Sequence, residues 1–224
     1  MKKRVAILHT SMVFINVEPI LKNLFEEILP DVEVVDFIDS KVLADVNRDG
    51  RITKDSVDRM AHLAQAAEHS GADVIFSACS SLGPSIDFAR QVVNLPIIKI
   101  DDAMARKAVE KGERVGVLAT VPTTLTPTSD LIQEKAREAG KEIVIKQKLS
   151  EGAFDKLMSG QTEEYERTVR QAAEELAKEV DLIVLAQASM TRLAPMLSEA
   201  TGLEVLTSPR LGVESIKEYL DHKA

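Results

Sequence analysis

The 224-residue sequence predicts an α/β protein of two pseudo-symmetric lobes, each with a mostly parallel sheet flanked by helices. Short apolar runs rich in β-branched residues alternate with longer amphipathic segments, the pattern of strands and helices in turn. Each of these runs is almost continuously hydrophobic, as expected for parallel strands that are covered on both faces. Parts of the first half recur in the second half at a nearly constant spacing, which predicts two copies of one unit.

Eight apolar runs are the expected strands. They span residues 5–8, 32–37, 74–76, 97–100, 115–118, 143–146, 182–185 and 205–206. Between them, residues 55–70 place Val57, Met60, Ala61 and Ala64 on one helical face. Similar helical spacing is found in residues 163–179 and 213–220.

The internal repeat rests on three pairs of segments in the same order. The pairs are residues 3–10 with 113–120, 73–81 with 181–189, and 95–98 with 203–206. The offsets are 110, 108 and 108 residues. We therefore expect a first lobe of residues 1–100 plus about 208–224 and a second lobe of residues 101–207, related by a pseudo-twofold axis.

The repeat also predicts where a functional site lies. In open parallel sheets, ligands bind beyond the carboxyl ends of the strands, and two facing lobes would place their strand ends along one cleft. The candidate residues at these ends are His9, Thr10, Ser11, Cys79, Ser80, Ser81, Thr120, Thr123, Gln187 and Ser189.

Cys79 is the only cysteine in the chain and directly follows an expected strand. A lone intracellular cysteine is most often a small buried hydrophobic residue. A helix that begins just after Cys79 would favour the thiolate, because the helix N-terminus carries partial positive charge. The position therefore favours a base or nucleophile.

The hydroxyl-bearing residues at the strand ends have two interpretations. Serine and threonine commonly cap helices. Hydroxyls and free backbone amides at helix starts also form a neutral anion site that suits a carboxylate. Because the sequence lacks a glycine-rich nucleotide-binding motif, a small acid is the expected ligand. His9 either donates to that ligand or has a structural role.

Residues 45–53 imitate a calcium-binding loop. The spacing of Asp45, Asn47 and Asp49 fits the pattern, but Ser56 stands where the loop needs a bidentate acid. We therefore expect no metal there, and a polar turn instead. A helix is expected to start at Thr53 or Asp55.

Composition excludes several classes of function. The net charge is −8, no basic stretch stands out, aromatic residues are 4% and Trp is absent, which argues against a nucleic-acid partner. No apolar run approaches the length of a membrane-spanning helix, and the run at 5–8 is too short for a signal peptide. A single cysteine allows neither an internal disulfide nor a cysteine metal cluster. A cytoplasmic protein is expected.

At the strand ends described above, the chain resembles the aspartate/glutamate racemase superfamily. This superfamily includes hydantoin racemases, maleate cis-trans isomerases and arylmalonate decarboxylases. The matching segments are residues 5–11, 71–81, 115–123, 185–189 and 207–210. The resemblance implies two α/β lobes with the site between them, a small carboxylic acid as substrate, and no metal or organic cofactor. It also suggests a homodimer.

Racemases of this superfamily use two cysteines, one at the end of the equivalent strand in each lobe. This sequence keeps the first as Cys79 and has Gln187 at the place of the second. A glutamine amide can form hydrogen bonds but is not a proton donor or acceptor for catalysis near neutral pH. Proton exchange between two thiols at positions 79 and 187 is therefore excluded.

Three chemistries remain open for a single thiol. Cys79 could attack an activated double bond, as in maleate isomerases, or protonate an enediolate after decarboxylation of a malonate-type acid. The cysteine of arylmalonate decarboxylases, however, resembles position 187 rather than 79. In the third chemistry His9 serves as the second acid/base of a racemase. A small-acid binding protein without turnover is the alternative from a different class.

Overall fold

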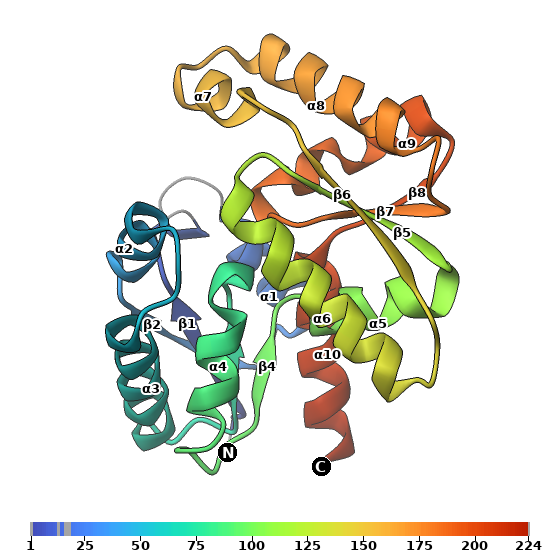
Figure 1. Cartoon of the computed structure of the whole chain (residues 1–224). Helices are drawn as coiled ribbons and strands as arrows, with labels where there is room; N and C mark the ends of the chain where they lie inside the picture. Colours follow the sequence, from blue (N-terminus) through green and yellow to red (C-terminus); the bar gives the residue numbers. More distant parts are fainter. Residues whose placement is uncertain (1, 13, 16–18, 224) are drawn as a thin grey trace. The chain divides into compact units, whose positions relative to one another are not determined.

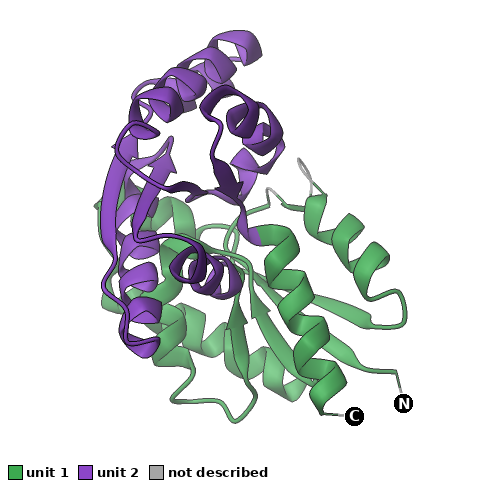
Figure 2. Ribbon diagram, turned by 90° about the vertical axis from the view of Figure 1, so that its right-hand side faces the viewer, with its two compact units in different colours: residues 1–100, 209–224 green, residues 101–208 purple. Residues whose placement is uncertain are grey.

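The computed structural model describes residues 2–12, 14–15 and 19–223 (Figure 1). Strands and helices alternate along the chain, which divides into two compact units. Unit 1 contains Met1–Ile100 and Pro209–Ala224, and unit 2 contains Asp101–Ser208 (Figure 2). The chain thus leaves unit 1 once and returns to it for its last helix.

Unit 1 has a parallel four-stranded sheet in the order β2-β1-β3-β4. Its strands are β1 (Arg4–His9), β2 (Glu33–Ile38), β3 (Val74–Ser77) and β4 (Ile97–Lys99). Its helices are α1 (Ile20–Ile28), α2 (Val42–Asp49), α3 (Lys54–His69), α4 (Gly83–Ala89) and α10 (Ser208–His222). A short 3-10 turn, Ser80–Leu82, links β3 to α4.

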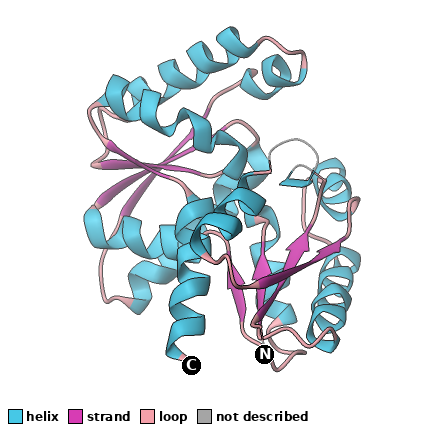
Figure 3. Ribbon diagram, turned by 180° about the vertical axis from the view of Figure 1, so that it is seen from behind, coloured by secondary structure: helices cyan, strands magenta, loops and turns pink. Residues whose placement is uncertain are grey.

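Unit 2 repeats this arrangement with the strand order β6-β5-β7-β8, again all parallel. Its strands are β5 (Arg114–Ala119), β6 (Val144–Leu149), β7 (Leu182–Leu185) and β8 (Glu204–Leu206). Its helices are α5 (Asp102–Lys111), α6 (Leu125–Glu138), α7 (Ala153–Met158), α8 (Thr162–Leu176) and α9 (Ala194–Thr201). Two 3-10 turns, Pro122–Thr124 and Ala188–Leu193, follow β5 and β7. Helices flank the sheet in each unit (Figure 3).

The two units agree in register as well as in strand order. Val5 pairs with Val74 in unit 1, and Val115 pairs with Leu182 in unit 2, the positions that the repeat equates. Each unit also has an aspartate before its third strand. Asp73 and Asp181 accept a hydrogen bond from the backbone N–H of Arg4 and Arg114, respectively, both at 2.8 Å. The predicted fold class, two similar α/β lobes with parallel sheets, is confirmed.

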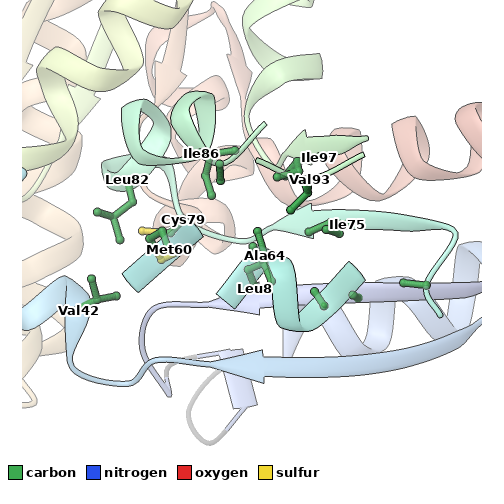
Figure 4. Close-up of a cluster of buried hydrophobic side chains, with 14 of the residues drawn as sticks. Leu8, Val42, Met60, Ala64, Ile75, Cys79, Leu82, Ile86, Val93 and Ile97 are labelled. Atoms are coloured by element: carbon green, nitrogen blue, oxygen red, sulfur yellow. The ribbon is translucent and has the colours of Figure 1, made fainter. Parts of the chain in front are cut away.

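One hydrophobic core cluster of unit 1 lies on the face of its sheet that carries α2, α3 and α4. Ala6 and Leu8 of β1 belong to this core cluster. Figure 4 shows Leu8 together with Met60, Ile75 and Leu82. Because side chains alternate along a strand, Ile7 and His9 lie on the opposite face. In unit 2, a corresponding cluster contains Leu118, Ile183 and Leu185.

The expected coverage of every strand on both faces is wrong for the strands at one edge of each sheet. Val34 of β2 is 37% exposed and Val144 of β6 is 55% exposed. Both strands pair on one side only, and helices cover them incompletely. The central strands β1, β3, β5 and β7 are buried almost throughout, as expected.

The prediction of a polar turn at residues 45–53 is wrong for residues 45–49, which are helical. Residues 42–49 form α2, whose Val42 and Val46 are buried one turn apart. The turn is confined to Gly50, which ends the helix in the left-handed conformation with φ 64°. The next helix starts as predicted, because Thr53 caps α3 in a reciprocal capping box with Ser56.

Candidate functional site

The structure places the predicted site residues of each unit at one edge of its sheet. In unit 1, the N–H of Ala78 donates to the carbonyl of Leu8 at 3.1 Å, so the segments after β1 and β3 leave the sheet side by side. In unit 2, the N–H of Ala186 donates to the carbonyl of Leu118 at 2.9 Å. These bonds bring residues 9–11 near 79–81, and residues 120–123 near 187–189.

Cys79 lies directly beyond β3 and precedes the turn Ser80–Leu82 with extended backbone, φ −142° and ψ 111°. Its side chain belongs to the unit 1 core cluster, where Figure 4 shows it beside Met60. The residue is 9% exposed and forms no disulfide. It therefore combines the strand-end position of a reactive group with the packing of a small hydrophobic residue.

Gln187 occupies the matching position in unit 2, with a similar backbone conformation of φ −128° and ψ 128°. Its Oε1 atom accepts three hydrogen bonds. The donors are the N–H of Thr120 at 2.6 Å, the N–H of Val121 at 3.2 Å and the hydroxyl of Thr120 at 3.0 Å. The amide oxygen is thus the shared acceptor of three hydrogen-bond donors at the end of β5.

The hydroxyl residues do not cap the short helical turns after the strands. The cap positions of the three turns are held by Cys79, Val121 and Gln187, and none of these makes a side-chain cap bond. The predicted residues Thr10, Ser81 and Thr120 are buried, whereas Ser11, Ser80, Thr123 and Ser189 are partly exposed. The partly exposed hydroxyls lie at the strand ends, where a ligand could reach them.

The side chain of His9 lies on the opposite face of the sheet from that of Cys79, although their backbone segments leave the sheet side by side. Its Nε2 is 2.8 Å from Oδ1 of Asp36, and its side chain is 3% exposed while that of Asp36 is 48% exposed. Both line a pocket of about 380 Å³ between α1 and the sheet, with Ile7 and Phe25 among its apolar walls. This is the face opposite the core cluster that holds Cys79, so the structure does not bring the two side chains to the same face.

Lys99 is a buried charged residue at the same edge that was not among the sequence candidates. It ends β4, is 3% exposed, and its Nζ lies 3.0 Å and 3.3 Å from the two carboxylate oxygens of Asp87. The sequence carries a weak signal, because Lys99 stands inside the apolar run 97–100, between Ile98 and Ile100. Its importance depends on the strand order, which the sequence alone does not give.

The acidic residues of the calcium-like segment are held by basic side chains. Asp45 is in contact with Lys41, Arg48 and Arg59, and the hydrogen bonds from Lys41 and Arg59 lower its pKa to about 2. Over the described ranges, no group of three or more His, Cys, Asp or Glu residues could hold a metal ion. No helix there is both long and apolar enough to cross a membrane.

Solved structures of racemases share this fold. A glutamate racemase from Bacillus anthracis aligns over 100% of this chain and 84% of its own, with TM-score 0.74 and 15% identity. A putative Asp/Glu racemase from Yersinia pestis aligns over 96% and 98%, with TM-score 0.73 and 16% identity. An allantoin racemase from Klebsiella pneumoniae aligns over 99% of this chain and 89% of its own, with TM-score 0.68 and 17% identity.

No curated protein matches the sequence. The sequence does match a protein family over residues 17–216, which is most of the chain and includes all of unit 2 and most of unit 1. Since that match extends over both repeats and the fold agrees with solved racemases, the chain belongs to the Asp/Glu/Hydantoin racemase family, a family of isomerase enzymes.

Proposed function

We propose that this chain acts, without a cofactor, at the carbon next to a carboxylate of a small acid, and that Cys79 is its only thiol acid/base or nucleophile. One observation carries the proposal. Cys79 follows β3 at the carboxyl edge of the unit 1 sheet, and the repeat has Gln187 at the equivalent place in unit 2. A thiol is present in one half and an amide in the other.

The thiol can remove a proton from the carbon next to the carboxylate, or return one to it. Negative charge then develops on the carboxylate, and hydrogen-bond donors that are already in place lower the barrier. Ser80 and Ser81 at the turn after Cys79 are the donors proposed in unit 1. Thr10, Ser11, Thr123 and Ser189 are further candidates. Thr120, which the sequence also predicts, already donates both its N–H and its hydroxyl to Gln187.

A single thiol favours chemistry on one face of the substrate. Gln187 can neither take nor give a proton, and its oxygen already accepts three hydrogen bonds. Proton exchange with retention, isomerisation through a thiol adduct, and decarboxylation with one protonation all need only Cys79. The same observation therefore supports a decarboxylase of malonate-type acids as the second candidate.

The test is turnover in D₂O with a panel of small acids: aspartate, glutamate, hydantoins, allantoin, maleate and substituted malonates. We expect deuterium at the α-carbon, isomerisation or CO₂ release with one class of acid. Cys79→Ala should reduce the rate by about 10²–10⁴-fold, the usual contribution of a positioned acid/base. Ser159→Ala, at an exposed residue after α7, is the matched control and should keep the full rate.

Two outcomes would contradict the proposal. One is the absence of any reaction across the panel, and the other is an equal rate for wild type and Cys79→Ala. Calorimetric binding of one of these acids without turnover would instead support a binding protein that keeps the site and has lost the reaction. The packing of Cys79 against Met60 and Leu82 gives that alternative its structural basis.

A further inference from the structure

The pocket beside His9 is a part of unit 1 that the proposed reaction at Cys79 does not use. Its volume of about 380 Å³ lies within the usual range for pockets that bind small molecules. Its walls come from β1, β2, α1 and the segment between α1 and β2. Every described residue that lines the pocket belongs to unit 1. The pocket can therefore be considered within that unit alone.

Most of the pocket wall is apolar and is held in place by packing. Ile7 is in register with Asp36, and Val34 lies two residues before Asp36, so all three point to the same face of the sheet. Phe25 of α1 forms another part of the wall. Its ring packs edge-on against that of Phe76 on β3, with the ring centroids 6.0 Å apart. An apolar ligand would therefore meet a wall that is already formed.

His9 and Asp36 are the polar pair of this wall. The Nε2 of His9 donates to Oδ1 of Asp36 at 2.8 Å, since a carboxylate oxygen can only accept. The other ring nitrogen, Nδ1, is buried and has no hydrogen-bond partner among the described residues. A buried polar atom without a partner costs free energy, so packing alone does not explain a histidine at this position. Its bond to Asp36 holds the carboxylate at the pocket.

The charges along the pocket favour a cation. Asp36 is half-exposed, and its ion pairing in the described part of the chain is with His9 and with no lysine or arginine. The other charged residues of the wall, Lys22 and Glu26, lie one turn apart on α1 with 3.9 Å between Nζ and Oε1. Their opposite charges offset each other. What remains is one carboxylate beside apolar walls.

Unit 2 uses the equivalent face for structure. The offset of 110 residues equates His9 with Ala119, and the strand register then equates Asp36 with Gln147. The Nε2 of Gln147 donates to the hydroxyl of Ser129 on α6 at 2.9 Å, which ties that helix to the sheet. The helix after β5, α6, has 14 residues, whereas the helix after β1, α1, has 9. The polar pair thus occurs in the unit whose covering helix is short.

We propose that this pocket binds a small organic cation, a molecule with an apolar body and one ammonium group, and that Asp36 receives the ammonium. Burial of the apolar body against Ile7, Val34 and Phe25 stabilises the complex. Oδ1 of Asp36 accepts from His9, which leaves Oδ2 for the ligand. A hydrogen bond between an ammonium and a carboxylate is among the stronger ones in proteins.

This binding site goes beyond the proposed reaction and does not rest on it. The side chain of Cys79 belongs to the core cluster on the other face of the sheet, and the pocket lies between α1 and the sheet. The ligand also differs in charge, because the acid proposed for the reaction is an anion and the ligand of this pocket is a cation.

The experiment compares three indole probes with different head groups: tryptamine has an ammonium, tryptophol a hydroxyl and indole-3-acetate a carboxylate. Because the protein contains no Trp, the fluorescence of a probe is read without an indole signal from the protein. The fluorescence anisotropy of each probe is measured against the concentration of the intact protein. We expect saturable binding of tryptamine and no saturable binding of indole-3-acetate. Tryptophol should bind at least about tenfold more weakly than tryptamine, because hydrogen bonds between charged groups are the stronger ones.

Two variants locate the ligand. Asp36→Asn should weaken the binding of tryptamine by at least about tenfold and leave that of tryptophol nearly unchanged, because it removes the charge and keeps the shape. Val34→Phe fills the pocket from β2 and should abolish the binding of both probes, and it keeps the test decisive if Asp36→Asn fails to fold. Asp58→Asn is the matched control, since Asp58 lies on α3 and is paired with Lys54. Its affinities should equal those of wild type.

Four results would overturn the proposal. They are the absence of saturable tryptamine binding to wild type, equal tryptamine affinities for wild type and folded Asp36→Asn, binding of indole-3-acetate as tight as that of tryptamine, and binding that survives Val34→Phe. None of these measurements uses turnover, so the cation site and the reaction at Cys79 can fail separately.

Discussion

Gln187 ties the segment after β5 to the segment after β7 through one atom. Its Oε1 accepts from two backbone N–H groups and one hydroxyl of residues 120 and 121. A thiol is a weak hydrogen-bond acceptor, whereas an amide oxygen is a good one. Glutamine at this position therefore cannot transfer a proton, but its hydrogen bonds stabilise the segments at the carboxyl edge of the unit 2 sheet.

Gln187→Ala is expected to lower the free energy of unfolding by about 1–3 kcal/mol, because it leaves partly buried donors of Thr120 and Val121 without their acceptor. Urea denaturation followed by circular dichroism measures the change. Gln171→Ala is the matched control, since Gln171 is exposed on α8 and its change should stay within about 0.5 kcal/mol. Equal losses for the two variants would show that the three hydrogen bonds contribute nothing.

The sequence could predict where Cys79 and Gln187 lie, because a residue that follows a buried parallel strand must emerge at the carboxyl edge. It could not predict the partners that these side chains have. His9 meets Asp36 only because β2 lies beside β1, and Lys99 borders Ser77 only because β4 lies beside β3. The opposite faces of His9 and Cys79 follow from the register of β1 and β3, in which Leu8 pairs with Ser77. Strand order and register are set by tertiary packing, which the sequence alone does not show.

Among the elements, the buried strands were the most predictable and α2 the least. Strands such as residues 182–185 are continuous apolar runs, and β7 has the same bounds. In α2 the buried Val42 and Val46 stand one helical turn apart. Asp45, Asn47 and Asp49 obscured this helical signal, because their spacing imitates a calcium-binding loop. Side-chain chemistry typical of turns was outweighed there by burial of two valines.

Arg59 of α3 joins two elements, since it binds Asp39 after β2 and Asp45 on α2. Its hydrogen bonds hold the pKa of Asp39 below its ordinary value and contribute to the pKa of about 2 for Asp45. A carboxylate whose pKa is lowered by folding stabilises the protein above its ordinary pKa near 3.9 and loses that contribution as the pH falls through the lowered value.

Arg59→Met should therefore reduce thermal stability at pH 6 and have a much smaller effect at pH 2. The measurement is Tm against pH for both proteins, and the difference between them should narrow between about pH 4 and pH 2. Arg167→Met, which removes an exposed arginine paired with Glu164, should leave the pH dependence as in wild type. A constant difference in Tm across this range would contradict the assignment.

At the scale of the whole chain, unit 1 is assembled from two distant segments. The chain passes into unit 2 at Asp101 and comes back at Pro209, so α10 completes a unit whose sheet was built from the first hundred residues. Gly212 allows this helix to approach closely. A Cβ atom there would lie 2.7 Å from the carbonyl oxygen of Ile100 and 3.0 Å from the ring of Phe76.

Gly212→Ala should consequently weaken the docking of α10 and destabilise unit 1 by about 1–3 kcal/mol, the usual cost of overpacking against a rigid neighbour. Gly83→Ala is the matched control, because its nearest contact would be 4.0 Å away, on the side chain of Lys99, and helical alanine is favourable. Hydrogen exchange shows which of the two units is destabilised, which a single melting curve does not. Amides of β1 and β3 should exchange faster in Gly212→Ala while those of β5 and β7 keep their protection, because local opening follows the cooperative unit that is weakened. Equal acceleration in all four strands would mean that the two units unfold as one.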